Sequence, residues 1–270
     1  MDFPAIAVGG PEAAAGLVRG DWEFAHTGAL PVAEQVLMGR DVVIVLTPTC
    51  EFGNSFVVTR PEISDLAQLD GKKVGVVTET GQTSVAARLA IEKAGASATY
   101  LPLLRFDRIS AALAGGEIDA GTLPVEVRFG AQERYRWNAF ALNEFGTPSA
   151  FATTRRLIAS NRELVMRVMQ CFAEAIQVFK TRPDIVVPML QRYVKIEDRG
   201  AADRLHAFHV PLFQNVPRPS FPGMSALRAY LLKTFPTAVL LRDIDISDAS
   251  LISELGKNGF IDGLYAEHTG

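Results

Sequence analysis

Strand-like and helix-like patterns alternate along the first half of this chain, and no other feature of the sequence constrains the fold as strongly. The run DVVIVLTPT at 41–49 is apolar on both faces, which is typical of a strand buried inside a parallel sheet. It follows the helical pattern PVAEQVLMG at 31–39, which a glycine closes. The same order restarts after Gly71, where three further strand patterns alternate with two helical ones. This repeated βαβ order predicts an α/β protein with mostly parallel sheets flanked by helices.

Two short stretches, Asp21–Val32 and Gly116–Val127, indicate two halves built on one plan. Each reads as an acidic turn after a glycine, followed by a strand of small residues that ends near a proline (DWEFAHTGALPV and GEIDAGTLPVEV). Two further segments, 55–63 and 149–158, have extended patterns and both contain a Thr-Arg pair. We interpret them as two antiparallel hinge strands that join two lobes.

The length of the chain agrees with a division into two lobes. Its 270 residues, of which 48% are hydrophobic, are enough for two compact units of roughly 100 to 150 residues each. The first predicted lobe is discontinuous and includes a largely helical C-terminal part, so that it comprises residues 1–58 and 152–270. The second predicted lobe comprises residues 59–151.

The charge and the hydropathy of the chain exclude several kinds of partner. The formal net charge is −3 and the basic residues are scattered, so we expect no nucleic-acid partner. The apolar runs are much shorter than the ~20 residues of a membrane-spanning helix, so we expect no direct membrane insertion. The first ten residues, MDFPAIAVGG, contain no basic segment followed by an apolar one, and therefore no visible export signal.

Four stretches, in this order, carry a resemblance to a known family: AGLVRGDWEFAHTG, SFVVTRPEISDLAQLDGKKVGVVTETGQTSVAARLAIEKAG, ISAALAGGEIDAGTLP and IASNRELVMRVMQCFAEAIQVFKTRPD. The chain resembles the periplasmic substrate-binding proteins of nitrate, sulfonate and taurine ABC transporters, which share a superfamily with the thiamine-pyrimidine synthases. The resemblance implies a two-lobed, periplasmic-binding-protein-like fold of type II. It also implies a small-molecule ligand in the cleft between the lobes, an ABC permease as partner, and no cofactor.

The same resemblance implies a strand and a helix ahead of the segment that begins here at Phe3. Without that strand, backbone groups in the first lobe would be left unpaired, which is costly when they are buried. We therefore expect an exposed groove in the first lobe or a partner that fills it. The resemblance implies a periplasmic location, whereas a genuine start at Met1 would imply a cytoplasmic one.

The sharpest candidate binding segment is TETGQTS, residues 78–84. In open α/β sheets, ligands collect at the carboxyl ends of the strands, and this segment follows a buried strand and opens a helix. A glycine permits the tight turn, and the free N–H groups and hydroxyls could bind an anion. The alternative is simple helix capping by Thr80 or Thr83. The candidate ligand residues here are Thr80, Gly81, Gln82, Thr83 and Ser84.

The corresponding strand of the other lobe ends at His26, Thr27 and Gly28, which are candidates for the same reason. Gly28 precedes a helical pattern, so it would expose helix N-terminal donors to a ligand. Three roles remain open for His26, namely a ligand contact, a buried structural imidazole and a catalytic base.

The remaining candidates are mostly polar residues near the first hinge and the strand ends. A carboxylate in the cleft would favour a cationic or hydrogen-bond-donating ligand group, although Glu126 could simply be a solvated residue at a helix N-terminus. Arg105 could pair with an anionic ligand or form a surface salt bridge. These candidates are Cys50, Glu51, Asn54, Arg105, Thr122, Leu123 and Glu126.

Two functions of different classes follow. The favoured one is a solute-binding protein that holds a small anionic or polar organic molecule, with no catalytic residue, metal ligand or cofactor assigned. The alternative is a cytosolic enzyme on the same scaffold, similar to a pyrimidine synthase or an aromatic-acid decarboxylase, in which His26 with Cys50 or Glu51 would be the suspected pair. The cysteine-rich motif of the pyrimidine synthases is missing around Cys50.

Overall fold

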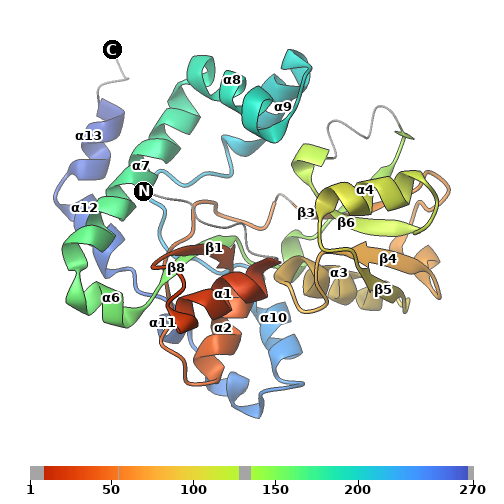
Figure 1. Ribbon diagram of the computed structural model, residues 1–270, viewed down its shortest axis with the longest axis horizontal. Coiled ribbons are helices and arrows are strands. Elements are labelled where there is room, and N and C mark those ends of the chain that lie inside the picture. Colours follow the sequence, from red (N-terminus) through yellow and green to blue (C-terminus); the bar gives the residue numbers. More distant parts are fainter. Residues whose placement is uncertain (1–8, 54, 128–134, 267–270) are drawn as a thin grey trace.

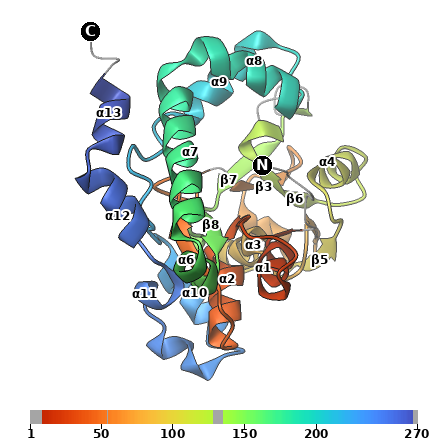
Figure 2. The same ribbon diagram turned by 60° about the vertical axis from the view of Figure 1, so that its left-hand side comes forward.

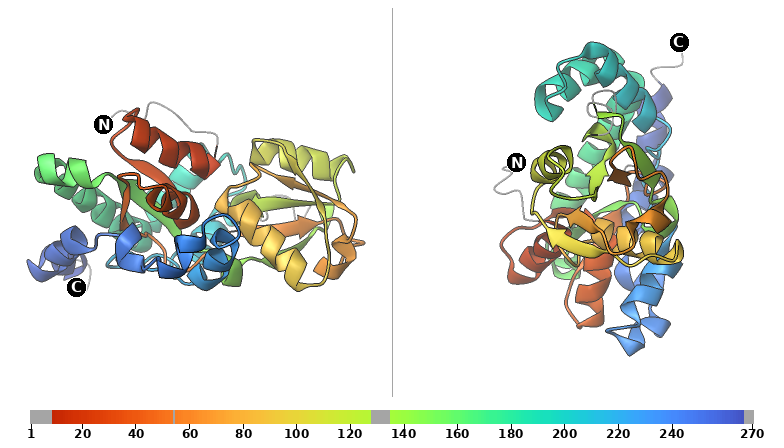
Figure 3. Two further views of the ribbon diagram at one scale, coloured as in Figure 1. Left: turned by 90° about the horizontal axis from the view of Figure 1, so that it is seen from below. Right: turned by 90° about the vertical axis from the view of Figure 1, so that its right-hand side faces the viewer.

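The computed structural model describes residues 9–53, 55–127 and 135–266, which form two lobes (Figure 1). Each lobe contains one β-sheet, and the two lobes lie side by side when the molecule is seen from below (Figure 3). The smaller sheet has the strand order β1-β8-β2 and comprises Ala25–Gly28, Ser149–Thr153 and Val43–Leu46. The larger sheet has the order β5-β4-β6-β3-β7 and comprises Thr99–Pro102, Lys73–Val76, Ala120–Pro124, Ser55–Thr59 and Asn138–Ala141.

The smaller sheet has β8 at its centre, antiparallel to both neighbours. Thr27 of β1 pairs with Ala150, and Ile44 of β2 pairs with Ala152. The two outer strands therefore run in the same direction, as the βαβ order predicts. We had expected a mostly parallel sheet, and this prediction was wrong for the smaller sheet. Strand β8 returns from the other lobe and lies between β1 and β2, antiparallel to both.

The larger sheet is mixed. Strands β5, β4 and β6 are parallel, as predicted from the alternation that restarts after Gly71. Strand β3 runs antiparallel to both β6 and β7, so the parallel part ends at the β6–β3 pair.

The two segments interpreted as antiparallel hinge strands lie in different sheets. Strand β3 lies between β6 and β7 in the larger sheet, whereas β8 lies in the smaller one. The second segment is also shorter than its extended pattern, because Oγ1 of Thr154 accepts a hydrogen bond from the N–H of Leu157 and starts helix α6. The predicted lobe boundaries at 58/59 and 151/152 thus cut through both strands. We propose that the chain crosses between the lobes just before β3 and just before β8.

Helices cover both faces of the smaller sheet because its strands are apolar on both sides. Ile44 packs into one core with helices of the first and last parts of the chain, and Val43 and Val45 pack into another. The first face carries α1 (Gly9–Arg19), α2 (Ala29–Leu37), α10 (Met224–Leu231), the 3-10 helix η3 (Pro236–Leu240) and α11 (Asp243–Ile246). The second carries α6 (Arg155–Ser160), α7 (Arg162–Thr181), α12 (Ser250–Lys257) and α13 (Phe260–Ala266).

The larger sheet is covered in the same way. Helix α3 (Gln82–Lys93) and the 3-10 helices η1 (Leu66–Leu69) and η2 (Asn143–Phe145) pack on one face, and α4 (Phe106–Ala114) packs on the other. The sequence after β6 has a helical pattern over 125–134; a helix begins at Val125, and residues 128–134 lie outside the described part of the chain. The run PAIAVGG at 4–10 has a strand-like pattern and also falls mostly outside that part; its last two residues, Gly9 and Gly10, begin α1 instead of a strand.

The lobes interlock through two elements that pack across the boundary. Val85 of α3 packs in a core of the smaller lobe, beside Leu17 and Leu227. In the other direction, α7 leads to α8 (Pro183–Val194) and α9 (Arg199–His209), which arch towards the larger lobe (Figure 2). Leu205 of α9 is fully buried in the core with Trp137. Within the described ranges, no helix is both long and apolar enough to cross a membrane.

Candidate ligand-binding site

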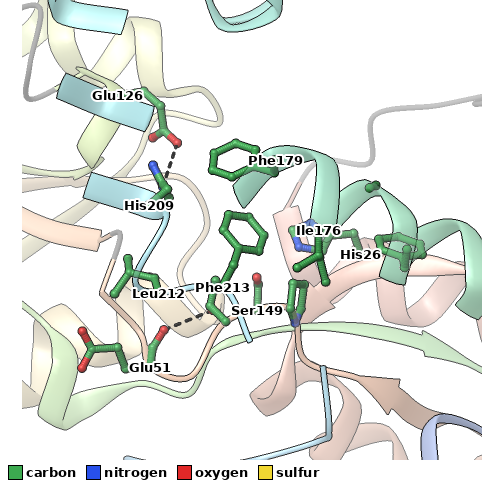
Figure 4. Close-up of a pocket in the computed structure, with 13 residues that line it drawn as sticks. His26, Glu51, Glu126, Ser149, Ile176, Phe179, His209, Leu212 and Phe213 are labelled. Atoms are coloured by element: carbon green, nitrogen blue, oxygen red, sulfur yellow. Dashed lines mark hydrogen bonds and ion pairs between the residues drawn. The ribbon is translucent and has the colours of Figure 1, made fainter. Parts of the chain in front are cut away.

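A pocket of about 410 Å³ lies where elements of both lobes meet (Figure 4). This volume is within the range that holds small organic ligands in proteins. Its walls come from β1, β8 and α7 of the smaller lobe, from the segment after β2, from the residue two positions after β6, and from the end of α9. The lining residues are His26, Pro48, Thr49, Glu51, Glu126, Ser149, Phe172, Ala175, Ile176, Phe179, His209, Leu212 and Phe213.

One wall of the pocket is aromatic and aliphatic. Phe172, Ile176 and Phe179 follow one another at helical spacing, so α7 presents all three on the same face. The ring of Phe213 lies against that of Phe179, with centroids 4.6 Å apart and planes inclined by 41°. The wall is therefore able to hold an apolar or planar ligand body by contact.

His26 faces the pocket because of the alternation of strand β1. Ala25 and Thr27 on either side of it are buried on the other face, and the imidazole is open to the cavity. The surrounding protein atoms nevertheless lower the pKa of His26 below its ordinary value, because they disfavour the charged imidazolium. His26 therefore contributes a neutral imidazole at neutral pH.

Glu126 and His209 approach each other across the pocket. Oε1 of Glu126 lies 3.8 Å from Nε2 of His209, and both side chains are largely shielded from solvent. Nδ1 of His209 is 3.0 Å from the carbonyl oxygen of Leu205. A carbonyl can only accept a hydrogen bond, so Nδ1 carries a proton and Nε2 faces the carboxylate. The second carboxylate in the pocket is that of Glu51. The backbone carbonyl oxygen of Glu51 accepts a hydrogen bond from Thr49 Oγ1 at 3.2 Å.

Three of the residues predicted from the sequence, His26, Glu51 and Glu126, line this pocket. They come from three separate parts of the chain: His26 lies within β1, Glu126 lies two residues after β6, and Glu51 lies in the loop between β2 and β3. The aromatic wall and His209 were missed. A helical stripe of phenylalanine and isoleucine has the same spacing whether it faces a core or a pocket, so periodicity alone does not distinguish the two.

The predicted anion-binding segment before α3 is not part of the lining of this pocket. Gln82 is buried, and its Oε1 accepts hydrogen bonds from the N–H of Leu30 at 3.2 Å and from Thr147 Oγ1 at 2.8 Å. Its Nε2 donates to the carbonyl oxygen of Thr147 at 2.7 Å. Gln82 thus joins α3 of the larger lobe to the N-terminus of α2 in the smaller one, and it does not line the pocket.

The neighbours of Gln82 also lie away from the pocket lining. Thr80 is exposed, Thr83 is partly exposed and Ser84 is buried. Gly81 is the N-cap of α3, its N–H donates to Thr78 Oγ1 at 3.1 Å, and no side chain caps this helix, so neither Thr80 nor Thr83 acts as the expected cap.

The other predicted residues are structural or outside the pocket lining. Thr27 Oγ1 donates to the carbonyl oxygen of Gly10 at 3.1 Å, and Gly28 is the N-cap of α2. Thr122 Oγ1 donates to the carbonyl oxygen of Gly75 at 3.5 Å, and Leu123 is in the core of the larger lobe.

Two charged or reactive candidates are exposed. Arg105 forms a bidentate pair with Asp107, with distances of 2.9 and 2.8 Å, so the surface salt bridge is realised. The Cys50 side chain is exposed, and its backbone N–H donates to the carbonyl oxygen of Leu212, a pocket residue. Asn54 lies outside the described residues.

Comparisons with known proteins agree on family and fold. The family model described as NMT1/THI5 like matches residues 6–185. A relative from Brucella abortus, whose name provisionally describes a binding protein without a stated ligand, is 25% identical over 202 residues. That match covers 71% of this chain and 61% of the relative, so the chain spans about three fifths of the length of the curated relatives it matches.

Two solved structures share the architecture. The alkanesulfonate-binding protein SsuA from Xanthomonas axonopodis pv. citri, bound to MOPS, has a TM-score of 0.70 at 18% identity, covering 88% of this chain and 83% of that one. The periplasmic aliphatic sulphonate binding protein SsuA from Escherichia coli has a TM-score of 0.63 at 16% identity, covering 94% and 76%. The two-lobed periplasmic-binding-protein fold expected from the sequence is therefore confirmed.

Proposed function

The chain belongs to the NMT1/THI5-like family, and on that premise we propose that it is the solute-binding component of an ABC-type importer. It captures a small polar organic molecule in the pocket between its lobes and releases it to a permease. The solved structures of similar fold include a periplasmic sulphonate-binding protein, which supports a periplasmic place of action for this chain as well.

One observation carries this proposal. The pocket of about 410 Å³ takes its lining from both lobes and from the segments at the boundary, so a ligand bound there would contact both lobes at once. Binding energy would then favour the arrangement in which the lobes are closed around the ligand, which is how two-lobed binding proteins couple capture to a change of shape.

The proposal is tested by filling the pocket. Ala175 lines the pocket from an exposed position on α7, so Ala175→Trp adds bulk to the cavity without removing a buried side chain. We expect this variant to lose ligand binding, measured by isothermal titration calorimetry, while its melting temperature without ligand stays close to that of the parent. Glu174→Trp adds the same side chain to the adjacent exposed position, which is not part of the lining, and should bind normally. Equal binding by both variants would contradict the site.

The enzyme alternative is tested by incubating the protein with each molecule that it binds. Of its suspected residues, His26 and Glu51 line the pocket, whereas the exposed Cys50 side chain does not. We expect each bound molecule to be recovered unchanged after prolonged incubation, as judged by mass spectrometry. Turnover that His26→Ala abolishes would favour the enzyme instead.

A further inference from the structure

The charged side chains that line the pocket are all acidic. Glu51 and Glu126 each contribute a carboxylate, and none of the described lining residues is a lysine or an arginine. The imidazole of His26 is neutral for the reason given above. The second lining imidazole, that of His209, already faces the carboxylate of Glu126. An anionic ligand here would be removed from water beside two carboxylates, with no lysine or arginine among the described lining residues to offset them, which is unfavourable.

The end of one helix adds to this negative field. His209 is the last residue of α9. The C-terminal end of a helix carries a partial negative charge, so this end favours a cation beside His209.

One lysine lies close to the pocket wall, but its ammonium group already has partners. Nζ of Lys180 donates to the carbonyl oxygen of Phe213 at 2.8 Å and also to Oδ1 of Asn215. The side chain is therefore held by protein acceptors behind Phe213, and it is not among the lining residues.

The aromatic wall suits the same kind of ligand. Phe172, Phe179 and Phe213 line the cavity. Figure 4 shows the rings of Phe179 and Phe213 side by side on this wall. The face of an aromatic ring attracts a cation, and its surface also packs against apolar or planar groups.

Resting on the function proposed above, we propose that the ligand of this pocket is an organic cation: an amine, ammonium or amidinium group on an apolar or aromatic body. The carboxylates of Glu126 and Glu51 bind the charged group, and the phenylalanine rings hold the body. This ligand class is opposite in charge to the sulfonates named for the related proteins of known structure.

The experiment compares three probes of similar size and different charge, namely benzylamine, benzyl alcohol and benzenesulfonate. Binding is measured by thermal shift and by ligand-observed NMR on the parent chain, Glu126→Gln, Glu51→Gln and Glu174→Gln. We expect benzylamine to bind most tightly, and each pocket substitution to weaken it by about tenfold or more, because a charge-assisted hydrogen bond is lost. Glu174→Gln changes an exposed carboxylate outside the lining and should leave binding unchanged.

The outcomes separate this inference from the function on which it rests. Preferential binding of benzenesulfonate that Ala175→Trp blocks would overturn the cationic ligand and keep the binding site. Benzylamine binding that is equal in the parent chain, Glu126→Gln and Glu51→Gln would also overturn it. If no probe binds, or if Ala175→Trp leaves all binding intact, the proposed pocket function itself fails and the inference fails with it.

Discussion

His26 makes the stability of the protein depend on pH in a direction that its surroundings determine. Burial among protein atoms lowers the pKa of His26 in the folded protein below the ordinary value of 6.5, which applies to the unfolded chain. As the pH falls below about 6.5, the unfolded chain therefore binds a proton at this position more readily than the folded protein does. The free energy of unfolding should decrease in that range.

We expect His26→Gln to remove this contribution. Between pH 7.5 and pH 5.5 the parent should lose stability relative to the variant, by less than about 1 kcal/mol because the side chain keeps contact with solvent. Urea unfolding of both proteins at the two pH values measures the change in the free energy of unfolding with pH. The contributions of the other titrating groups are the same in both proteins and cancel when the two changes are compared. Parallel pH profiles would show that the imidazole titrates alike in both states.

At the level of single residues, the sequence predicted the polar part of the pocket better than its apolar part. His26, Glu51 and Glu126 could be selected because each lies within or after a segment with a strand pattern, which is a local signal. Phe179 and Phe213 could not, because their roles depend on which element packs against α7. That packing brings together residues far apart in the chain, and no local pattern records it.

Among the elements, α2 and α3 are joined by one side chain. Gln82 satisfies the N–H of Leu30 at the start of α2 and makes two hydrogen bonds with Thr147, in the segment that leads into β8. Gln82 is buried, and Gly28 packs so closely against it that a Cβ on Gly28 would lie 2.9 Å from its Oε1 and Cδ atoms. This contact fixes the relative position of three segments at the lobe boundary.

Replacement of Gln82 by alanine should be costly. Buried polar groups of Leu30 and Thr147 would lose their partner, and we expect the free energy of unfolding to fall by about 2–4 kcal/mol. Thr83→Ala, at the next and partly exposed position of the same helix, should change it by less than about 0.5 kcal/mol. Chemical unfolding of the two variants provides the comparison. An equally small decrease in the free energy of unfolding of both variants would contradict this expectation. It would mean that water molecules replace the hydrogen bonds of the Gln82 carboxamide without loss of stability.

Local sequence patterns predicted where the strands form, but not how all of them pair. The strands β1 to β8 all formed at or within segments with strand-like patterns, since apolar alternation and flanking glycines are local signals. The central place of β8 in the smaller sheet was not predicted, because Ala150 and Ala152 find their partners more than 100 residues earlier in the chain. Small apolar residues are compatible with either direction of pairing.

In the whole molecule, the two lobes share cores although they are separate in outline. Val85 of the larger lobe packs in a core of the smaller one, and Leu205 from the C-terminal half packs beside Trp137 of the larger lobe. Neither lobe can lose its structure without exposing apolar surface of the other. We therefore expect the protein to unfold in one cooperative transition.

The two tryptophans of the chain allow a direct test, because they report on different lobes. Trp22 packs against α1 and donates from Nε1 to the carbonyl oxygen of Ala13 at 2.9 Å, whereas Trp137 is buried in the core that contains Leu205. In Trp22→Phe and Trp137→Phe, the fluorescence of the remaining tryptophan follows one lobe at a time. Leu205→Ala, added to each, should lower the free energy of unfolding by about 2–5 kcal/mol, because it leaves a cavity in that core. If the lobes unfold together, this loss appears equally at Trp22, on the far side of the boundary. A shift seen by Trp137 alone would mean that each lobe unfolds independently, and that closure around a ligand is the docking of two autonomous units.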